Sequence, residues 1–168
     1  KSLENAVQME YKALTDDMTG AYNKNRLIEL LNNRERDGQD IAVIYWDVNQ
    51  LKYVNDNWGH LCGDRLITEV AKTIQSIARE EDIVIRYGGD EFLLYVANGT
   101  KEIAEQLIKT WKVRLEEEKK RENYEFPVSA SVGYALGKHS QLKDIIAAAD
   151  KDMYANKRIC RESYQSKR

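Results

Sequence analysis

Hydrophobic and polar residues follow two different periods along this chain. A near-continuous apolar run over residues 41–48 predicts a buried central strand, and the alternation of Val128, Ala130 and Val132 with small residues predicts a half-buried one. Apolar residues at helical spacing predict helices in five segments, 2–14, 27–31, 66–78, 103–115 and 142–153. The pattern therefore predicts a mixed domain of helices and strands.

Two short apolar runs, 83–85 and 92–96, flank the segment Gly88-Gly89-Asp90-Glu91. They are too short for helices and rich in β-branched or aromatic residues, so they predict two strands joined by a tight hairpin. A hairpin turn needs one glycine at most. The second lets backbone approach a bulky ligand, and the adjacent acids supply hard oxygen ligands. Taken alone, the segment is equally consistent with a solvated turn.

From residue 41 to residue 136 the predicted order is strand, helix, strand, strand, helix, strand. This is the split βαβ pattern of ferredoxin-like folds, in which an antiparallel sheet packs helices on one face. The end of the first strand and the hairpin turn then fall at the same edge, so we expect Asp47 and Asp90 to meet there. An acid at a strand end is commonly just solvated. Two converging carboxylates instead repel unless a cation lies between them, and Mg²⁺ takes one or two carboxylates together with phosphate oxygens.

Composition narrows the function classes. With 168 residues, 42% hydrophobic and 32% charged, the chain fits one globular domain, and we see neither a bilayer-length apolar run nor a signal peptide. A net charge of −2 and a pI near 5.8 argue against a broad nucleic-acid footprint but allow a local phosphate pocket. Cys62 and Cys160 lack metal-ligand spacing, which favours reduced thiols in a cytoplasmic domain over a disulfide or a zinc site. A start at Lys1 rather than Met suggests a fragment of a longer protein.

Gly88-Gly89-Asp90-Glu91-Phe92 spells the signature of the GGDEF domain, the diguanylate cyclase family. Further segments resemble family motifs in the family's order: residues 16–23, residues 47–56 followed by Gly59-His60 and Gly63-Asp64, and residues 149–157. The resemblance covers about residues 13–161. It implies an α+β fold with a ferredoxin-like βαββαβ core, similar to the cyclase and polymerase palm, with extra flanking helices. Cyclases of this family condense two GTP into cyclic di-GMP.

The resemblance implies a metal and catalytic site at the edge already described. Asp47, the main-chain carbonyl of Val48 and Asp90 would hold Mg²⁺, with two ions at each GTP and Mn²⁺ as an alternative ion. Glu91 is the remaining expected catalytic acid, near the base or the second metal. Asn49 stands where the family often has a second Asp, which removes one negative charge near the metals.

The resemblance also places the nucleotide. Asn55 and Asp64 match guanine-reading positions, and a carboxylate can accept from guanine N1 and N2 donors that adenine lacks. Viewed alone, Asn55 is equally well explained as a turn former and Asp64 as a helix N-cap. Lys52, Lys157 and Arg161 match phosphate-contacting positions, although a lone basic residue is usually a solvated surface charge. Two departures, Cys160 and Glu162, replace the usual Gly and Asn around Arg161 and weaken its case.

Arg79 and Asp82 form an Arg-x-x-Asp motif upstream of the two glycines. In the family this motif is an inhibitory product site, where Arg and Asp bind guanine and phosphate of cyclic di-GMP. It precedes the second strand, at the opposite end from the metals, so a strand of about six residues would separate the sites by roughly 20 Å. Product bound there would lock domains in unproductive orientations. A charged helix end before an acidic strand start is the alternative explanation.

We therefore expect a diguanylate cyclase catalytic domain over residues 15–168, preceded in residues 1–14 by the end of a connecting helix. Each domain of a homodimer would supply one GTP through its catalytic face, with dimerisation driven by a regulatory region before Lys1. GTP and cyclic di-GMP are the expected partners, in the bacterial cytoplasm. The full-length protein could be membrane-attached, but this segment should contact neither a membrane nor a nucleic-acid polymer.

Two other function classes remain open. A non-catalytic module would bind GTP or cyclic di-GMP and regulate a neighbouring domain, but it has no need of metal ligands, and Asp47, Asp90 and Lys157 are all present. An RNA-binding module of the same strand order needs exposed aromatic residues on its sheet and a basic surface, which the acidic balance of the chain disfavours.

Overall fold

The computed structural model describes residues 2–165 and the side chains of residues 2–159. In chain order the elements are α1 (Ser2–Leu14), α2 (Lys24–Asn32), η1 (Arg34–Arg36), β1 (Asp40–Val48), α3 (Leu51–Trp58), α4 (His60–Ile77), β2 (Ile83–Arg86), β3 (Glu91–Ala97), α5 (Lys101–Glu122), β4 (Ala130–Lys138), η2 (His139–Gln141) and α6 (Leu142–Gln165). Every element expected from the apolar pattern is present, and α3 is an addition to it. None of the described helices is long and apolar enough to cross a membrane.

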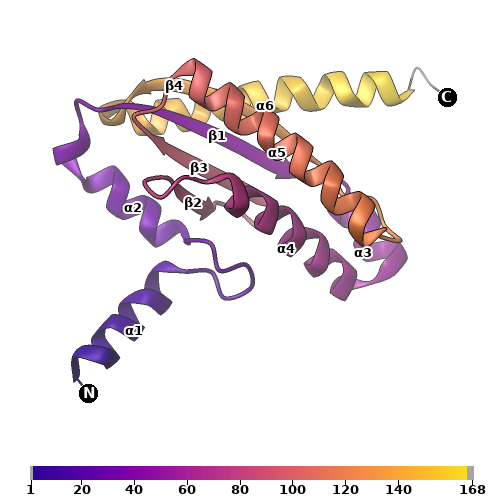
Figure 1. Cartoon of the computed structure of the whole chain (residues 1–168), viewed down its shortest axis with the longest axis horizontal. Coiled ribbons are helices and arrows are strands. Elements are labelled where there is room, and N and C mark those ends of the chain that lie inside the picture. Colours follow the sequence, from indigo (N-terminus) through magenta and orange to yellow (C-terminus); the bar gives the residue numbers. More distant parts are fainter. Residues whose placement is uncertain (1, 166–168) are drawn as a thin grey trace.

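A four-stranded antiparallel sheet in the order β2-β3-β1-β4 forms the centre of the molecule. The order confirms the ferredoxin-like βαββαβ core, because β3 pairs with β1 and thereby places β2 and β1 in the same direction. Asp47, near the end of β1, lies opposite Glu91 on β3 and Ser131 on β4. The end of β1 and the β2–β3 turn therefore lie at the same end of the sheet (Figure 1).

Helices cover both faces of the sheet, whereas the topology alone predicted helices on one face (Figure 1). Ile44 and Trp46 of β1 pack with α4 and α5 in one core, and Val43 and Tyr45 pack with α2 and α6 in a second. The reason lies in β1 itself, since its apolar run does not alternate and so must be buried on both sides. The flanking helices that the resemblance implied supply the second cover.

The open edge of β4 is closed by side chains of α6. Asp152 accepts a hydrogen bond from the backbone N–H of Tyr134 at 2.9 Å, and Asn156 donates to the carbonyl of Val132 at 2.7 Å. These contacts stand in for the ladder bonds that an edge strand lacks. They also fix α6 along β4, so that Lys157, one residue further on, has a defined position over the sheet.

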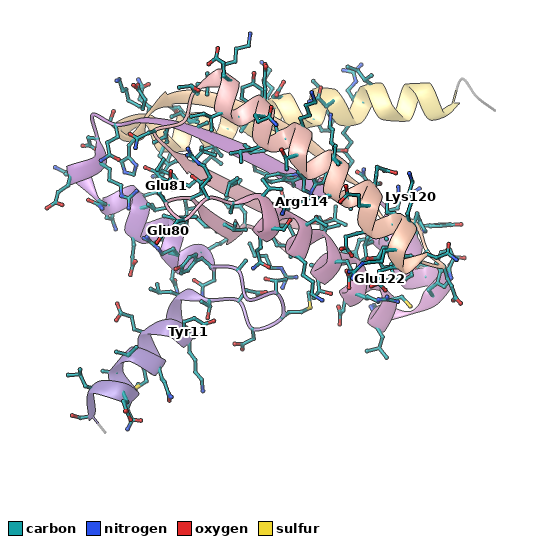
Figure 2. All side chains as sticks on the ribbon, viewed as in Figure 1. Tyr11, Glu80, Glu81, Arg114, Lys120 and Glu122 are labelled. Atoms are coloured by element: carbon teal, nitrogen blue, oxygen red, sulfur yellow. The ribbon has the colours of Figure 1, made fainter. Side chains whose placement is uncertain are left out.

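The first helix, α1, projects away from the sheet (Figure 1). None of its described residues is buried, and Tyr11, labelled in Figure 2, is 64% exposed. Only the end of the helix is anchored, because the side chains of Asn23 and Asn25 each donate to the carbonyl of Ala13 at 2.9 Å. The helix is therefore an arm attached to the domain at one end.

Candidate active site

Asp47 and Asp90 lie together at the end of the sheet, as the strand order predicts. The backbone N–H of Val48 donates to the carbonyl of Asp90 at 2.8 Å, so the pairing of β1 with β3 continues into the turn. Asp47 is the last residue but one of β1, and Asp90 directly precedes β3. Asp47 thus lies within β1, and Asp90 lies in the turn directly before β3, where the pairing with β1 positions it.

The carboxylate of Asp47 has one partnered oxygen and one without a partner. Its Oδ2 lies 3.0 Å from Nζ of Lys157, which reaches it from α6. Its Oδ1 is buried and has no hydrogen-bond partner among the described residues. A buried oxygen left unpaired is costly. This atom is therefore suited to a ligand that the chain itself does not supply.

Burial, and then the negative charge of Asp47, raises the pKa of Asp90 above its ordinary value. The charge of Glu91 acts in the same direction, while Lys157 opposes it. Holding these acids together in ionised form is unfavourable unless positive charge is added. The electrostatics of this edge therefore favour a bound cation.

The donor set fits Mg²⁺ or Mn²⁺ that arrives with a nucleotide. Asp47 and Asp90 offer hard carboxylate oxygens, and the main-chain carbonyl of Val48 belongs to the same strand end. Among the described residues, no group of three or more His, Cys, Asp or Glu side chains converges on a metal-sized site. Mg²⁺ needs only one or two carboxylates when phosphate oxygens and waters complete its shell. Asp47, Asp90 and the carbonyl of Val48 could therefore supply part of the ligand shell of such an ion.

Glu91 is bound to Tyr45 instead of joining a three-acid cluster. The hydroxyl of Tyr45 donates to Oε2 of Glu91. Burial, and then this hydrogen bond, raises the pKa of Tyr45, so the hydroxyl keeps its proton and acts as the donor. Sequence reasoning missed Tyr45 because a tyrosine within an apolar strand run looks like an ordinary core residue.

The two loop glycines have different structural reasons. Neither adopts a left-handed φ, so the turn itself does not require them. A Cβ at Gly88 would lie 2.5 Å from Oε1 of Glu91, so this glycine makes room for the carboxylate of its own hairpin. Gly89 is exposed, and no described atom lies within 4 Å of the corresponding Cβ position. Gly89 thus has open space beside it, and the close approach of a ligand there stays a prediction.

The two guanine-reading candidates lie on consecutive helices joined at Gly59. Asn55 is on α3, and its carbonyl accepts from the N–H of Gly59 at 2.9 Å. Gly59 has φ 90°, in the left-handed region, and is the N-cap of α4, so Asp64 lies inside that helix and is exposed. These positions exclude the alternatives of a turn former at Asn55 and an N-cap at Asp64.

Gly63 brings the two candidates into one arrangement. A Cβ at Gly63 would lie only 1.7 Å from Oδ1 of Asn55, so the glycine makes room for that side chain on α4. Asn55 is half-buried against the helix, and Asp64 follows Gly63 directly. Their guanine-binding roles stay a prediction. Helix α3 was missed from the sequence because Val54 is its one buried residue, too little for an amphipathic pattern.

Of the three phosphate candidates, Lys157 is placed in the site by its contact with Asp47. Lys52 is exposed on α3. Arg161 is within α6, but its side chain, like those of Cys160 and Glu162, lies outside the described residues. The assignments of Lys52 and Arg161 therefore stay predictions.

Asn49, the departure from the family's second Asp, has two partners beside β4. Its Nδ2 donates to Oγ of Ser129 at 3.1 Å, and its Oδ1 accepts from Oγ of Ser131 at 3.1 Å. A carboxylate could accept but not donate in this bridge. Asn49 therefore connects the end of β1 to β4, and Asp47 and Asp90 carry the negative charge of the edge.

Arg86 connects the Gly-Gly turn to the motif at residues 16–23, a link that sequence reasoning missed. Its Nη2 donates to the carbonyl of Gly89 at 2.7 Å, and its Nη1 lies 3.1 Å from Oδ1 of Asp16. Burial alone would raise the pKa of Asp16, but hydrogen bonds from Thr19 and the charge of Arg86 lower it overall. A single arginine at a strand end gives no sign of such a bridge.

Arg79 and Asp82 pair with each other at the opposite end of the sheet. The side chain of Asp82 is fully buried, and its oxygens accept from Nε and Nη2 of Arg79 at 3.0 and 2.9 Å. Arg79 also donates to the carbonyl of Ala97 at 2.7 Å and is 30% exposed. Figure 2 shows Glu80 and Glu81 in the same loop. Of the pair, Arg79 is therefore the residue that can meet a ligand, and Asp82 holds it in place.

The distance between the end of the sheet at Arg79 and the end at the Asp47–Asp90 pair is shorter than expected. Strand β2 has four residues, Ile83–Arg86, rather than about six. Five residue steps from Asp82 to Tyr87 then span about 17 Å at the usual rise of a strand. A ligand at Arg79 still lies a whole strand length from the Asp47–Asp90 pair.

Comparisons with known proteins agree with this geometry. The family model "Diguanylate cyclase, GGDEF domain" matches residues 13–163. The probable diguanylate cyclase DgcJ of Escherichia coli K12 is 34% identical over 148 residues, which cover 86% of this chain and 29% of that protein. The cyclic di-GMP phosphodiesterase PdeR of the same strain is also 34% identical, over 149 residues covering 86% of this chain and 22% of PdeR. The chain thus spans less than a third of the length of these relatives.

Solved structures give the same family. The coiled coil and GGDEF domain of DgcB from Caulobacter crescentus, in complex with c-di-GMP, has a TM-score of 0.79 and 27% identity, covering 92% of this chain and 86% of that one. Diguanylate cyclase SiaD from Pseudomonas aeruginosa, in complex with its activator SiaC, has a TM-score of 0.75 and 27% identity, covering 94% and 63%. This chain belongs to the GGDEF domain family of diguanylate cyclases.

Proposed function

We propose that this chain is the catalytic domain of a diguanylate cyclase, which condenses two GTP into cyclic di-GMP and releases pyrophosphate. The observation that carries the proposal is the Asp47–Asp90 pair with its buried, unpaired Oδ1 at Asp47. Two like charges held together by strand pairing are unfavourable in themselves. They are accounted for by a site that binds a cation with a phosphate ligand.

In this proposal Asp47, the carbonyl of Val48 and Asp90 hold Mg²⁺ or Mn²⁺. When bound, such ions neutralise the triphosphate and favour deprotonation of the attacking ribose 3′-hydroxyl. Lys157 already lies 3.0 Å from Asp47, so a change of partner from carboxylate to phosphate needs little movement of α6. Lys52 and Arg161 are further phosphate contacts in the proposal.

Guanine is read by Asn55 and Asp64. The exposed carboxylate of Asp64 accepts from guanine N1 and N2, which adenine cannot match, and a site left with an unpaired acceptor rejects the wrong base. Gly63 lets Asn55 lie close to α4, so both groups approach one base from the same pair of helices. The expected substrate is therefore GTP rather than ATP.

The active species in this proposal is a dimer of domains, with each 3′-hydroxyl facing the α-phosphate held by the partner. Residues 15–168 form the catalytic domain, and residues 1–14 form the end of a connecting helix. The projecting α1, with none of its described residues buried, supports that division. The related DgcB structure comprises a coiled coil and a GGDEF domain.

Product inhibition is proposed at Arg79. Its partly exposed guanidinium is preorganised by Asp82 and by the carbonyl of Ala97, which suits a planar donor for guanine or phosphate. The site lies a strand length from the metals. Bound cyclic di-GMP would therefore act on the orientation of domains rather than by blocking GTP.

The test fuses a parallel dimeric coiled coil before Lys1, supplies GTP with Mg²⁺, and separates the nucleotides by chromatography. We expect cyclic di-GMP from the fusion, and a loss of about 100-fold or more in its Asp90→Ala variant. Asp17→Ala is the matched control, because Asp17 is an exposed acid outside the Asp47–Asp90 edge. Product formation that survives Asp90→Ala would contradict the metal assignment.

A second candidate is a regulatory module that binds nucleotide without turnover. The observation in its favour is the equal similarity of the chain to PdeR, whose name is that of a phosphodiesterase. The same experiment decides between the two. GTP binding by the fused dimer without cyclic di-GMP would favour regulation.

A further inference from the structure

Tyr45 lies beneath the metal edge, on the same face of β1 as Asp47. It is only 2% exposed, and its ring packs edge to face with Tyr87 at 5.8 Å between centroids. Its cross-strand partner is Leu93, so Glu91 is its diagonal neighbour on β3, within reach of a long side chain. The packing fixes the ring, and the ring therefore fixes the position of its hydroxyl.

The hydroxyl of Tyr45 holds the carboxylate of Glu91, and the absence of a side chain at Gly88 leaves room for it. Oε2 accepts from the hydroxyl, and Oε1 occupies the space where a side chain at position 88 would begin. One oxygen of the carboxylate is thus held by Tyr45 of β1, and the other lies over the Cα of Gly88 in the turn. Glu91 nevertheless pairs directly with Asp47 in the sheet register and follows Asp90 in sequence.

Three acids therefore stand at one strand end, yet no cluster of three His, Cys, Asp or Glu side chains suited to a metal forms among the described residues. Glu91 instead has the hydroxyl of Tyr45 as its hydrogen-bond partner. A carboxylate released at this position could swing toward Asp47 and Asp90 and add a third negative ligand. Metal affinity rises with the number of charged ligands, so the number of free acids here matters.

We propose that Tyr45 is a positioning residue that holds Glu91 against Gly88 and keeps it out of the Asp47–Asp90 metal site. The proposal rests on the proposed function in assuming that the pair binds a divalent cation with GTP. It assigns Tyr45 a role that neither its apolar surroundings nor the signature motif indicates. It also gives Gly88 a reason, which is to leave space for the retained carboxylate.

The first test measures metal binding without turnover. Calorimetry follows Mn²⁺ binding to the 168-residue chain in the presence of 3′-deoxy-GTP, which lacks the attacking hydroxyl. We expect Tyr45→Phe, which removes only the hydroxyl, to bind Mn²⁺ about threefold or more tightly than the unmodified chain, because Glu91 becomes free to join the site. The effect should vanish in Tyr45→Phe/Glu91→Gln, since the amide carries no charge.

Tyr95→Phe is the matched control. Tyr95 is also 2% exposed and also donates or accepts through a buried hydroxyl, but its partner is His139, outside this edge. We expect its Mn²⁺ affinity to equal that of the unmodified chain. Equal affinity of Tyr45→Phe and the unmodified chain, or tighter binding that persists in the double variant, would overturn the proposal.

The second test uses the coiled-coil fusion with GTP and Mg²⁺. We expect Tyr45→Phe to lower kcat about tenfold with KM for GTP nearly unchanged, and to have no further effect in the Glu91→Gln background. If Tyr45 only stabilised the fold, Tyr45→Phe would lower kcat by the same factor in the unmodified fusion and in the Glu91→Gln fusion. If the unmodified fusion makes no cyclic di-GMP, the proposed function fails while Mn²⁺ binding still decides the role of Tyr45. Absence of Mn²⁺ binding in the unmodified chain would overturn both.

Discussion

The carboxyl group of Asp90 ionises against both burial and the charge of Asp47, so the folded protein without metal carries an electrostatic cost at this residue. We expect Asp90→Asn to stabilise the metal-free chain at pH 7 by about 0.5–1 kcal/mol, because the amide removes one of the two like charges from a partly solvated pair. Urea denaturation in the presence of a chelator measures the difference.

The stabilisation expected from Asp90→Asn should depend on pH. The pKa of Asp90 is raised in the folded state above its ordinary value of 3.8, so its ionisation disfavours folding. The cost is absent below pH 3.8 and complete above the raised pKa, and the advantage of Asp90→Asn should disappear as the pH falls. Asp17→Asn, at an exposed acid, is the control. No difference at pH 7, or a difference that grows in acid, would show that the two carboxylates do not repel as inferred.

The strands and the meeting of Asp47 with Asp90 could be predicted from the sequence because both follow from period and topology. An apolar run fixes a strand, and the strand order then brings its end to the hairpin turn. The contacts of Tyr45, Gly63 and Arg86 could not be predicted in this way. Each depends on which neighbour a side chain contacts on another strand or helix. A single sequence does not show the distances between segments that lie far apart along the chain.

The cover of the two sheet faces could likewise be predicted from the sequence only in part. The topology predicted helices on one face, but the unbroken apolar run of β1 already required cover on both. Helix α6 supplies much of the second cover by lying directly against β4. Its closeness depends on Gly133, where a Cβ would lie 2.1 Å from the backbone nitrogen of Met153.

Gly133→Ala should therefore separate α6 from β4. The colliding atom is backbone rather than a flexible side chain, so the helix itself must shift, and we expect a loss of about 3 kcal/mol or more in the free energy of unfolding. Thermal and urea denaturation measure it. Gly38→Ala is the control, because no described atom lies within 4 Å of its Cβ position and its φ is not left-handed. Equal stability of the two variants would show that α6 is not held against β4 as described.

Three features of the molecule lie apart from one another: the Asp47–Asp90 pair, Arg79 and helix α1. The Asp47–Asp90 pair lies at the end of β1, Arg79 lies a strand length away at the other end, and α1 joins the body at the motif that Arg86 bridges to the Gly-Gly turn. Among the described α-helices, α1 alone has no buried residue. If each domain supplies one GTP, the arm is the part of this chain best placed to bring two domains together.

Dimerisation should therefore limit the activity of the isolated chain. Leu3 and Val7 lie one helical turn apart on α1 and are 80% and 60% exposed, but a stripe this short buries too little apolar surface for a tight dimer. We expect sedimentation velocity to show a monomer at low micromolar concentration, with specific activity rising in proportion to protein concentration because turnover needs two domains. A coiled coil fused before Lys1 should remove that dependence. Leu3→Ser/Val7→Ser should leave the specific activity of the fusion unchanged. In the isolated chain the same substitutions should move the rise in specific activity to higher protein concentration. A tight dimer of the isolated chain, with constant specific activity on dilution, would contradict this expectation, and persistence of that dimer in Leu3→Ser/Val7→Ser would show that the catalytic domains associate without the arm.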